Sequence, residues 1–245
     1  MNKMIAIDVG NTSIDIAQFK EGKLQRTRKI PTFGITKASL NKVLGSKRSE
    51  KILVCSVVPK VTKIFKSLKV PVSIIGQNVG VPIKSLYHEK QIGMDRLVGA
   101  YAAKKIFPGT RLVLDFGTAI TLDFLSKSNV YQGGIILPGI GSTLKVFSHC
   151  ALLPNQVKFE SAKKIIPTTT ENSITTGITE GFSLMINGLI KRYKKKLKIT
   201  PNEKVVITGG EAKAITPRLD FSFKYEPLLV LKGLEILSHD LPLKK

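Results

Sequence analysis

The sequence predicts an α/β fold made of two similar halves, and two observations support that prediction. One short pattern (an apolar run, an Asp, one spacer, a Gly, then a Thr) occurs twice, as IAIDVGNT at residues 5–12 and as LVLDFGTAIT at residues 112–121. Segments with strand and helix patterns alternate after both copies. With 245 residues, the chain accommodates two halves of average domain size, which we place at residues 1–108 and 109–245.

Both copies put a carboxylate and a tight turn at the end of a buried strand. The glycine carries no side chain, so the turn can approach a phosphate closely. Backbone N–H groups and the hydroxyls of Thr12 and Thr118 are donors for phosphate oxygens, and Asp8 and Asp115 can hold a neutralising cation. One copy alone would equally describe an ordinary hairpin. Two copies indicate a nucleotide whose phosphates are held between the halves.

The doubled pattern resembles the two phosphate motifs of the superfamily that contains acetate kinase, sugar kinases, heat-shock chaperones and actin. That resemblance implies a duplicated ribonuclease H-like fold, as in actin-like ATPases, with the nucleotide between two similar halves. A strand that ends in Gly209 and Gly210 offers bare backbone in the expected place for the adenosine. The sequence contains no GxxxxGK[ST], which excludes a P-loop as the phosphate cradle.

The first half alternates strand and helix patterns. An apolar strand leads into the first motif, and Gly22 supplies the turn between two further strands. Helical spacing stops at Gly45, Pro59 suits the first turn of a second helix, and Pro108 with Gly109 ends a third. The expected elements are strands at 4–8, 13–19, 23–30, 51–57 and 72–75, and helices at 35–44, 61–68 and 97–107.

The second half repeats this alternation. Pro138 and Gly139 mark a strong turn, and TTTE at residues 168–171 has the pattern of a capping box before a long helix with one apolar face. The basic run at residues 191–198 fits the solvated C-terminal end of that helix. The expected elements are a strand from residue 112, strands at 120–125, 130–137 and 204–208, and helices at 142–150, after 171 and at 228–237.

The segment YHEKQIGMDR, residues 87–96, leads directly into the third helix. A carboxylate at Asp95 is stabilised by the helix dipole there, which is a purely structural explanation for it. That explanation does not account for Gly93 beside an adjacent Asp95 and Arg96. A site needs this combination to bring a base and an anion-binding fork to one place.

The composition is strongly basic. Lys and Arg number 39 against 17 Asp and Glu, so the formal net charge is +22. Such a charge attracts nucleic acid, anionic lipid or anionic metabolites, and its sign does not choose among them. Since no aromatic-rich single-strand platform or known DNA-binding motif accompanies it, we expect no specific nucleic-acid partner.

The remaining composition indicates a cytoplasmic protein. Cys55 and Cys150 lie in apolar stretches without metal-ligand spacing and are expected to be buried thiols in a reducing compartment. None of the three histidines has the spacing of a zinc site. No run approaches the roughly 20 apolar residues that span a bilayer, and Asp8 interrupts the only apolar stretch near the N-terminus.

Taken together, the motifs resemble those of type III pantothenate kinases over nearly the whole chain. They occur in the order DVGNT, GMDR, DFGTAIT, GGIILPG, a Thr before the long helix, and TGG. The resemblance implies ATP-dependent phosphorylation of pantothenate, the first step of coenzyme A biosynthesis. It also implies a homodimer, a monovalent cation (K⁺ or NH₄⁺) and Mg²⁺ with ATP.

The resemblance also implies a role for each matching residue. Asp95 would be the catalytic base, and Asp115 would ligate the monovalent cation. ATP would be bound by Asp8, Val9, Gly10, Asn11, Thr12, Ser13, Ile14, Asp15 and Thr118. Pantothenate would be bound by Tyr87, Gly93, Met94, Asp95, Arg96 and Thr170. Two positions depart from the family pattern, because Thr169 replaces the usual Asn and Tyr87 lies one residue closer to GMDR.

Two other functions stay open from the residues. One is a regulatory nucleotide-binding relative similar to the Bvg accessory factors, which would not need turnover. The three acidic residues Asp8, Asp95 and Asp115 argue against it, since a binding protein has less need of Asp95. The other is a nucleic-acid binder, which only the net charge suggests.

Overall fold

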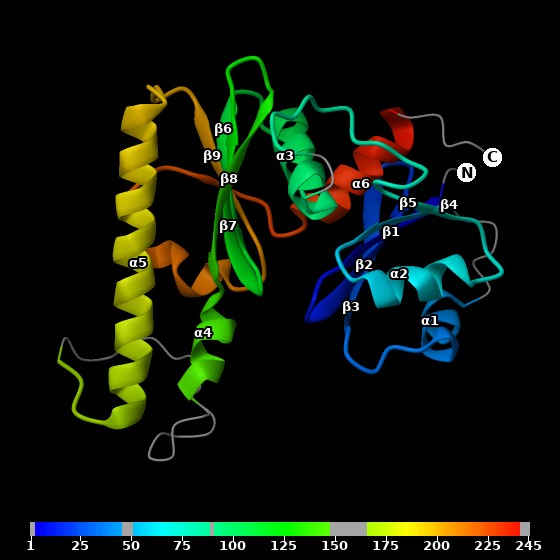
Figure 1. The fold of residues 1–245 in the computed structure, drawn as a ribbon, viewed down its shortest axis with the longest axis horizontal. Helices are drawn as coiled ribbons and strands as arrows, with labels where there is room; N and C mark the ends of the chain where they lie inside the picture. The colour runs from blue at the N-terminus through cyan, green and yellow to red at the C-terminus, as the bar shows by residue number, and fades with distance from the viewer. Residues whose placement is uncertain (1–2, 46–50, 89–90, 148–165, 241–245) are drawn as a thin grey trace. The chain divides into compact units, whose positions relative to one another are not determined.

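The computed structural model describes residues 3–45, 51–88, 91–147 and 166–240 (Figure 1). Contacts divide the chain into two compact units. The first unit comprises residues 1–108, 128–133 and 228–245, and the second comprises 109–127 and 134–227. The predicted functional halves, 1–108 and 109–245, stay a prediction.

The first unit contains a five-stranded sheet in the order β3-β2-β1-β4-β5. Its strands are β1 (Lys3–Val9), β2 (Ser13–Lys20), β3 (Lys23–Pro31), β4 (Lys51–Ser56) and β5 (Val72–Ile74). The first three form an antiparallel meander, while β4 runs parallel to β1 and β5 parallel to β4. In this register Asp8 lies opposite Asp15 on one side and Cys55 on the other.

The second unit contains a sheet with the same connectivity. Its strands are β6 (Thr110–Phe116), β7 (Ala119–Leu125), β8 (Tyr131–Pro138), β9 (Lys204–Thr208) and β10 (Lys224–Tyr225), in the order β10-β9-β6-β7-β8. When β6 to β10 take the places of β1 to β5, the two orders are identical. The predicted duplicated α/β fold is confirmed by this match.

Two helix layers cover the first sheet. The helices α1 (Lys37–Leu44) and α2 (Pro59–Lys66) share a core with Ile5 and Ile7. The helices α3 (Met94–Ile106) and α6 (Leu229–Asp240) share a core with Met4 and Ala6, and Figure 1 shows α6 beside α3. Because side chains alternate along a strand, Asp8 belongs to the face that α3 covers.

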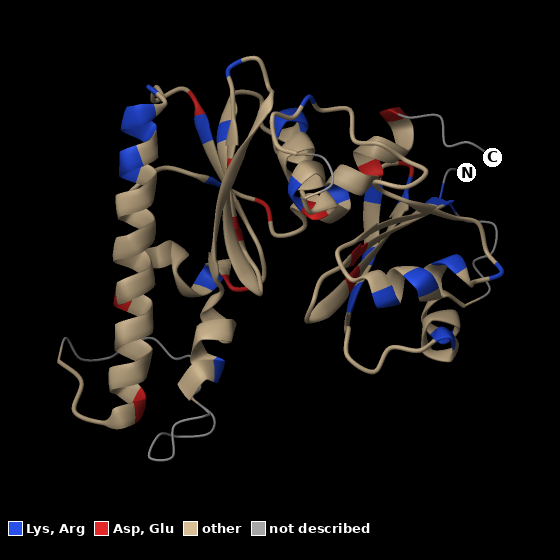
Figure 2. Ribbon diagram, viewed as in Figure 1, with Lys and Arg blue, Asp and Glu red and all other residues tan. Residues whose placement is uncertain are grey.

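In the second unit, the long helix α5 (Thr170–Lys196) packs against β6. Its Ile178, Ile186 and Ile190 share a core with Leu112 and Leu114. The helix α4 (Ile140–Phe147) and two 3₁₀ turns, η1 (Ala212–Ala214) and η2 (Thr216–Arg218), complete this unit. Figure 2 shows lysine and arginine gathered over the last turns of α5. Among the described residues, no helix is both long and apolar enough to cross a bilayer.

Three features of the second unit differ from the prediction made from the sequence or lie outside the described residues. The prediction of a capping box at TTTE, residues 168–171, is wrong. Thr169 is the N-cap, and its hydroxyl accepts the N–H of Asn172 at 3.3 Å. Asn and Thr are both good N-caps, so this role accounts for the departure at position 169. The short strand β10 and the two 3₁₀ turns were not expected. Residues 148–150, the end of the predicted helix at 142–150, and Cys150 lie outside the described residues.

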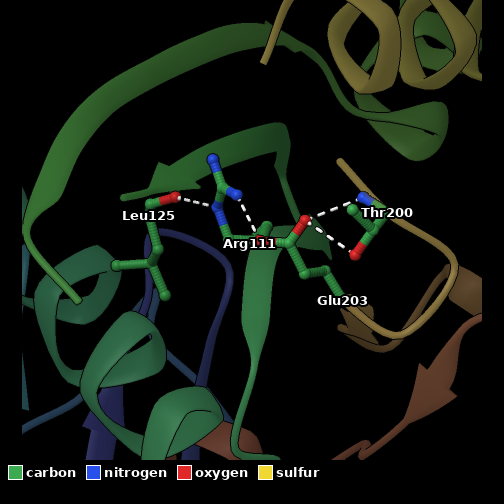
Figure 3. Close-up of polar contacts among 4 residues, drawn as sticks. All are labelled: Arg111, Leu125, Thr200 and Glu203. Carbon is green, nitrogen blue, oxygen red and sulfur yellow. Dashed lines mark hydrogen bonds and ion pairs between the residues drawn. The ribbon is translucent and has the colours of Figure 1, made fainter. Parts of the chain in front are cut away.

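A buried ion pair closes the start of β6 (Figure 3). The register shifts between Thr110 and Leu112, so Arg111 is the extra residue of a bulge. Its side chain is 7% exposed, forms an ion pair with Glu203, and donates from Nε to the Leu125 carbonyl at 2.8 Å. Glu203 also accepts the Thr200 N–H at 2.7 Å. The cluster links the start of β6 to the end of β7 and to the residue before β9.

Candidate active site

The first phosphate turn, between β1 and β2, is a compact loop held by Thr32, the residue that follows β3. The N–H of Gly10 donates to the Ser13 carbonyl at 2.9 Å. The Thr32 hydroxyl donates to the Gly10 carbonyl at 2.7 Å, and its N–H donates to the Thr12 carbonyl at 3.0 Å. Thr32 is buried, whereas Asn11 and Thr12 are exposed at the tip. The turn therefore presents polar groups to solvent on a fixed backbone.

Asp15, which lies opposite Asp8 in the hairpin, has partners of its own. The Lys29 ammonium lies 3.2 Å from its Oδ2, and the Ser13 hydroxyl donates to the same oxygen at 3.2 Å. These contacts fix the Asp15 side chain against residues of β2 and β3.

Cys55 connects two of the predicted acidic residues. Its thiol is fully buried, and its pKa is raised well above the usual value, first by burial and then by the negative charges of Asp8 and Asp95. Asp8 lies opposite Cys55 in the strand register, and Val57, two residues after Cys55, lies next to Gly93 at the start of α3, so Asp8 and Asp95 belong to one region of the first unit. A buried thiol with a raised pKa stays protonated at neutral pH and is a poor nucleophile.

The first turn of α3 fixes the orientation of Asp95. The helix begins at Met94, three residues earlier than predicted, with Gly93 as its N-cap. Asp95 Oδ1 accepts the backbone N–H of Arg96 at 2.8 Å. A Cβ added at Gly93 would lie 2.4 Å from that oxygen, so only glycine permits this arrangement. The carboxylate gains from the helix dipole and is also held for contact with a ligand.

The Arg96 side chain lies in a corner made by two tyrosines. Its guanidinium carbon lies 5.6 Å from the ring centroid of Tyr87 and 5.9 Å from that of Tyr131. Tyr87 therefore reaches Arg96 despite its altered spacing. Met94 instead packs against Gly76, whose added Cβ would lie 2.7 Å from the Met94 Cγ. Met94 can contact a ligand at this site through its backbone.

Three sequence motifs converge on the second phosphate turn. The Thr118 carbonyl accepts the Gly139 N–H at 3.0 Å and the Ser142 hydroxyl at 2.7 Å. An added Cβ at Gly139 would lie 2.2 Å from the Gly117 carbonyl oxygen. Gly209, with a φ of +97°, also packs closely against this turn, since a Cβ added there would lie 2.5 Å from Asp115 Oδ1. Bare backbone from LPG and TGG thus surrounds the turn of DFGT.

A family model described as Type III pantothenate kinase matches residues 4–192 of the chain. The chain belongs to the type III pantothenate kinase family. The type III pantothenate kinase of Sulfurihydrogenibium sp. is 33% identical over 254 residues, covering 96% of this chain and 99% of that protein. The enzyme of Listeria monocytogenes is 33% identical over 252 residues, covering 96% of both chains.

Solved structures confirm the predicted actin-like fold class. MreB 5 of Spiroplasma citri, bound to AMPPNP, has a TM-score of 0.56 at 11% identity and covers 98% of this chain and 97% of its own. A Campylobacter jejuni protein described as a Baf family transcriptional activator has a TM-score of 0.64 at 22% identity, covering 97% and 98%. Both likenesses show the fold alone, so the second adds nothing to the regulatory alternative.

The family's predicted site residues fall into both units. Asp8 to Asp15, Tyr87 and Gly93 to Arg96 lie in the first unit, and Asp115, Thr118 and Thr170 lie in the second. Thr170 is the first residue of α5 and lines an apolar groove of about 640 Å³. Thr32 and Tyr131 were not among the predicted site residues, although Tyr131 stands two residues before the Gly-Gly pair in YQGGIILPG, residues 131–139.

The oxygen atoms around Asp115 suit a hard cation. Asp115 is the residue before the last of β6, and a Cβ added at Gly209 would lie 2.5 Å from its Oδ1 and 2.4 Å from the Phe116 carbonyl oxygen. K⁺ and Mg²⁺ both prefer such oxygen donors. Within the described part of the chain, no three His, Cys, Asp or Glu side chains form a metal-binding group. Any cation at Asp115 therefore depends on backbone and ligand oxygens as well.

Proposed function

We propose that this chain transfers the γ-phosphoryl group of ATP to the primary hydroxyl of pantothenate, forming 4′-phosphopantothenate at the first step of coenzyme A biosynthesis. Membership of the type III pantothenate kinase family supports the reaction and both substrates. One observation carries the assignment of the site: Asp95 and Arg96 lie side by side at the start of α3, where Gly93 lies next to Val57, the residue after β4, the strand that pairs with Asp8 of β1. We place the reaction in the cytoplasm.

Asp95 is the general base in this proposal. Phosphoryl transfer needs in-line placement of the two substrates, neutralisation of the phosphate charge and a group that accepts the proton of the alcohol. The Arg96 N–H donates to one carboxylate oxygen of Asp95 at 2.8 Å, which fixes the orientation of the proposed base at the first turn of α3. General bases typically contribute a factor of about 100 to 10,000 to the rate.

The two phosphate turns bind the triphosphate of ATP. The Asp8–Asp15 loop supplies backbone N–H groups and the Thr12 hydroxyl, and Thr118 supplies a hydroxyl from the second turn. Mg²⁺ bound with ATP neutralises charge on the phosphate oxygens. Asp8 is placed to hold that ion, because its carboxylate projects from the end of β1 beside the first turn.

Asp115 holds the monovalent cation, K⁺ or NH₄⁺. Support comes from the turn geometry: a Cβ added at Gly209 would lie 2.5 Å from Asp115 Oδ1 and 2.4 Å from the Phe116 carbonyl oxygen, so both oxygens border the same bare backbone. A large monovalent ion suits a cage of this kind because carbonyl and carboxylate oxygens can surround it without a rigid geometry.

Arg96 binds the carboxylate of pantothenate. A guanidinium is planar and presents parallel N–H groups that match a carboxylate. Tyr87 lies over the same guanidinium, and the backbone of Gly93 and Met94 begins the adjacent helix turn. Thr170 completes the proposed set of pantothenate-binding residues.

The active form is a homodimer in which a second copy covers the apolar groove of the second unit. The groove is lined mainly by α5 and α4, and it measures about 640 Å³. Around it, Leu184 is 70% exposed and Val146 is 62% exposed. An apolar groove with exposed apolar side chains on the same two helices favours a protein interface.

An assay of ATP-dependent phosphorylation of pantothenate by the purified chain, with and without K⁺, tests the proposed function. We expect formation of phosphopantothenate and ADP in equal amounts. ATP binding without any turnover, under conditions where Mg²⁺ and K⁺ are present, would favour the regulatory alternative.

A further inference from the structure

The corner around Arg96 contains a residue to which the proposed function gives no role. Tyr131 is fully buried, yet its ring centroid lies only 5.9 Å from the Arg96 guanidinium carbon. The rings of Tyr87 and Tyr131 meet edge to face, with centroids 6.4 Å apart and planes at 69°. The two rings thus border the guanidinium of Arg96, a residue that is only 8% exposed.

Tyr131 is fixed by its backbone as well as by burial. Its N–H donates to the Lys84 carbonyl at 2.8 Å, and its carbonyl accepts the Leu86 N–H at 2.9 Å. These bonds form a bridge between the first residue of β8 and the segment that carries Tyr87. The two tyrosines are therefore held in register by one short ladder.

Gly133, two residues further along β8, supports the other wall. Its φ is +110°, a conformation that side chains disfavour. A Cβ there would lie 3.3 Å from Cδ2 of the Tyr87 ring. The ring of Tyr87 thus rests against bare backbone, and any side chain at position 133 would push it.

We propose that Tyr131 and Gly133 are positioning residues for the carboxylate-binding fork: they hold Arg96 and Tyr87 in the orientation that receives the carboxylate of the substrate. Aromatic faces attract a guanidinium electrostatically but accept no conventional hydrogen bond from it. The two rings therefore orient the guanidinium through its contacts with aromatic faces. This role rests on the proposed function, because it is defined for the binding of pantothenate.

The principal test compares Tyr131→Leu with Tyr131→Phe in steady-state kinetics. Leucine removes the aromatic wall, and we expect the KM for pantothenate to rise roughly tenfold, the size that loss of one desolvated cation–π contact gives. The KM for ATP should stay unchanged. Phenylalanine keeps the wall and should keep the KM for pantothenate within roughly twofold of the parent value.

Two control variants, Tyr101→Leu and Gly188→Ala, distinguish a positioning role from a general loss of packing. Tyr101→Leu removes another buried tyrosine of the same unit, one that lies near Lys104 and Lys105 rather than Arg96. It should lower Tm without changing the KM for pantothenate. Gly133→Ala should raise that KM, whereas Gly188→Ala in α5, where an added Cβ meets nothing within 4 Å, should not.

The alcohol analogue of pantothenate, in which the carboxylate is reduced to CH₂OH, provides a specificity readout. The parent chain should prefer pantothenate strongly, and Tyr131→Leu should lose most of that preference. Equal preference in the two proteins, or a Tyr131→Phe variant as impaired as Tyr131→Leu, would overturn the proposed role of Tyr131.

A spectroscopic measurement tests the corner independently of turnover. In the parent chain the ring currents of Tyr87 and Tyr131 should shift the Arg96 side-chain proton resonances upfield. Tyr131→Leu should reduce that shift, and Tyr131→Phe should preserve it. An unchanged Arg96 spectrum in Tyr131→Leu would refute the positioning role even if the parent chain turns over pantothenate, whereas a parent chain without turnover would refute the proposed function itself.

Discussion

Asp115 occupies in β6 the position that Asp8 occupies in β1: each is the residue before the last of its strand, and each is followed by a glycine turn. Their partners across the parallel neighbour differ, since Asp8 lies opposite Cys55 and Asp115 opposite Thr208. The duplicated scaffold therefore presents two equivalent carboxylates in different surroundings. This difference is consistent with the proposal that Asp8 serves Mg²⁺ with ATP and Asp115 serves a monovalent ion.

Replacing Asp95 by Asn should remove most of kcat while ATP binding persists. Asparagine keeps the size of the side chain but cannot accept the proton of the alcohol, so we expect a loss of about 100-fold or more. Steady-state kinetics and calorimetric titration with ATP measure the two effects. Asp220→Asn, an exposed residue of the second unit, is the matched control. A kcat near that of the parent chain would show that Asp95 is not the base.

Activity should depend on the monovalent cation through Asp115. We expect K⁺ and NH₄⁺ to support turnover and Na⁺ to support it poorly, because a smaller ion would not fill the same oxygen cage without strain. Asp115→Ala should abolish the response to K⁺ together with most activity. Rates measured in chloride salts at constant ionic strength test this, and equal rates in Na⁺ and K⁺ would remove the monovalent ion from the proposal.

Glu203 should make stability depend on pH. Burial opposes ionisation of its carboxyl, but the Thr200 N–H and Arg111 outweigh that effect and lower its pKa below the usual 4.5. A lowered folded-state pKa means that the stabilisation is present above the unfolded-state value and is lost as pH falls through the folded-state value. Glu203→Gln should therefore lower Tm at pH 7, and the difference from the parent chain should narrow below about pH 4.5.

Glu180→Gln provides the control for that experiment. Glu180 pairs with Arg218, but its side chain is 55% exposed, whereas that of Glu203 is 15% exposed. Exposed pairs contribute about 0 to 1 kcal/mol, while removing one partner of a buried pair costs about 3 to 5 kcal/mol. Equal Tm values for Glu203→Gln and the parent chain at pH 7 would show that the Arg111 cluster does not stabilise the fold.

A charge on the exposed face of α5 should prevent formation of the proposed homodimer. Leu184→Lys puts an ammonium group onto the apolar surface that the second copy covers, so sedimentation should report a monomer. Leu24→Lys on the edge strand β3, where Leu24 is 41% exposed, should remain dimeric. A parent chain that sediments as a monomer at micromolar concentration, or a dimeric Leu184→Lys, would contradict the proposed interface.

The lysines at the end of α5 should bind nucleic acid only through charge. Lys194 lies over the Phe221 ring at 5.3 Å and Lys196 over the Tyr193 ring at 5.8 Å. Changing Lys194, Lys195 and Lys196 to Gln should weaken binding to duplex DNA, and that binding should fall steeply with salt through counterion release. Kinase activity should stay the same. A salt-resistant, sequence-selective complex would support a nucleic-acid function, and loss of kinase activity would place this helix end at the active site or the dimer contact.

Much of the fold was predictable because local patterns specify it. Apolar runs of β length, glycine turns and proline at Pro59 marked the strands and helices of both sheets within a few residues. The duplication was visible in the repeated Asp-x-Gly pattern. The start of α3 was placed too late, since Gly93 acts as N-cap through backbone conformation without a capping side chain. The strand β10 covers two residues, too few for any periodicity.

The site was only partly predictable, because several contacts depend on tertiary structure. Asp8, Asp95 and Asp115 stood out by motif, but the meeting of Asp8 and Asp95 near Cys55 follows from strand pairing and helix packing. No local sequence pattern marks Thr32, since it stabilises the turn between β1 and β2 through a hydrogen bond from the residue that follows β3. Tyr131 reaches Arg96 because residues 128–133 pack in the first unit while the rest of β8 belongs to the second.

The C-terminal helix has a consequence for synthesis of the protein on the ribosome. Because α6 shares its core with β1 and α3, residues 1–108 cannot complete their apolar core until the last helix has left the exit tunnel. The second unit, whose residues are interrupted only at 128–133, needs no residue beyond 227 to complete its core. We therefore expect a released chain that is truncated before residue 228 to carry a protease-resistant second unit attached to an exposed first sheet, which is a target for chaperones.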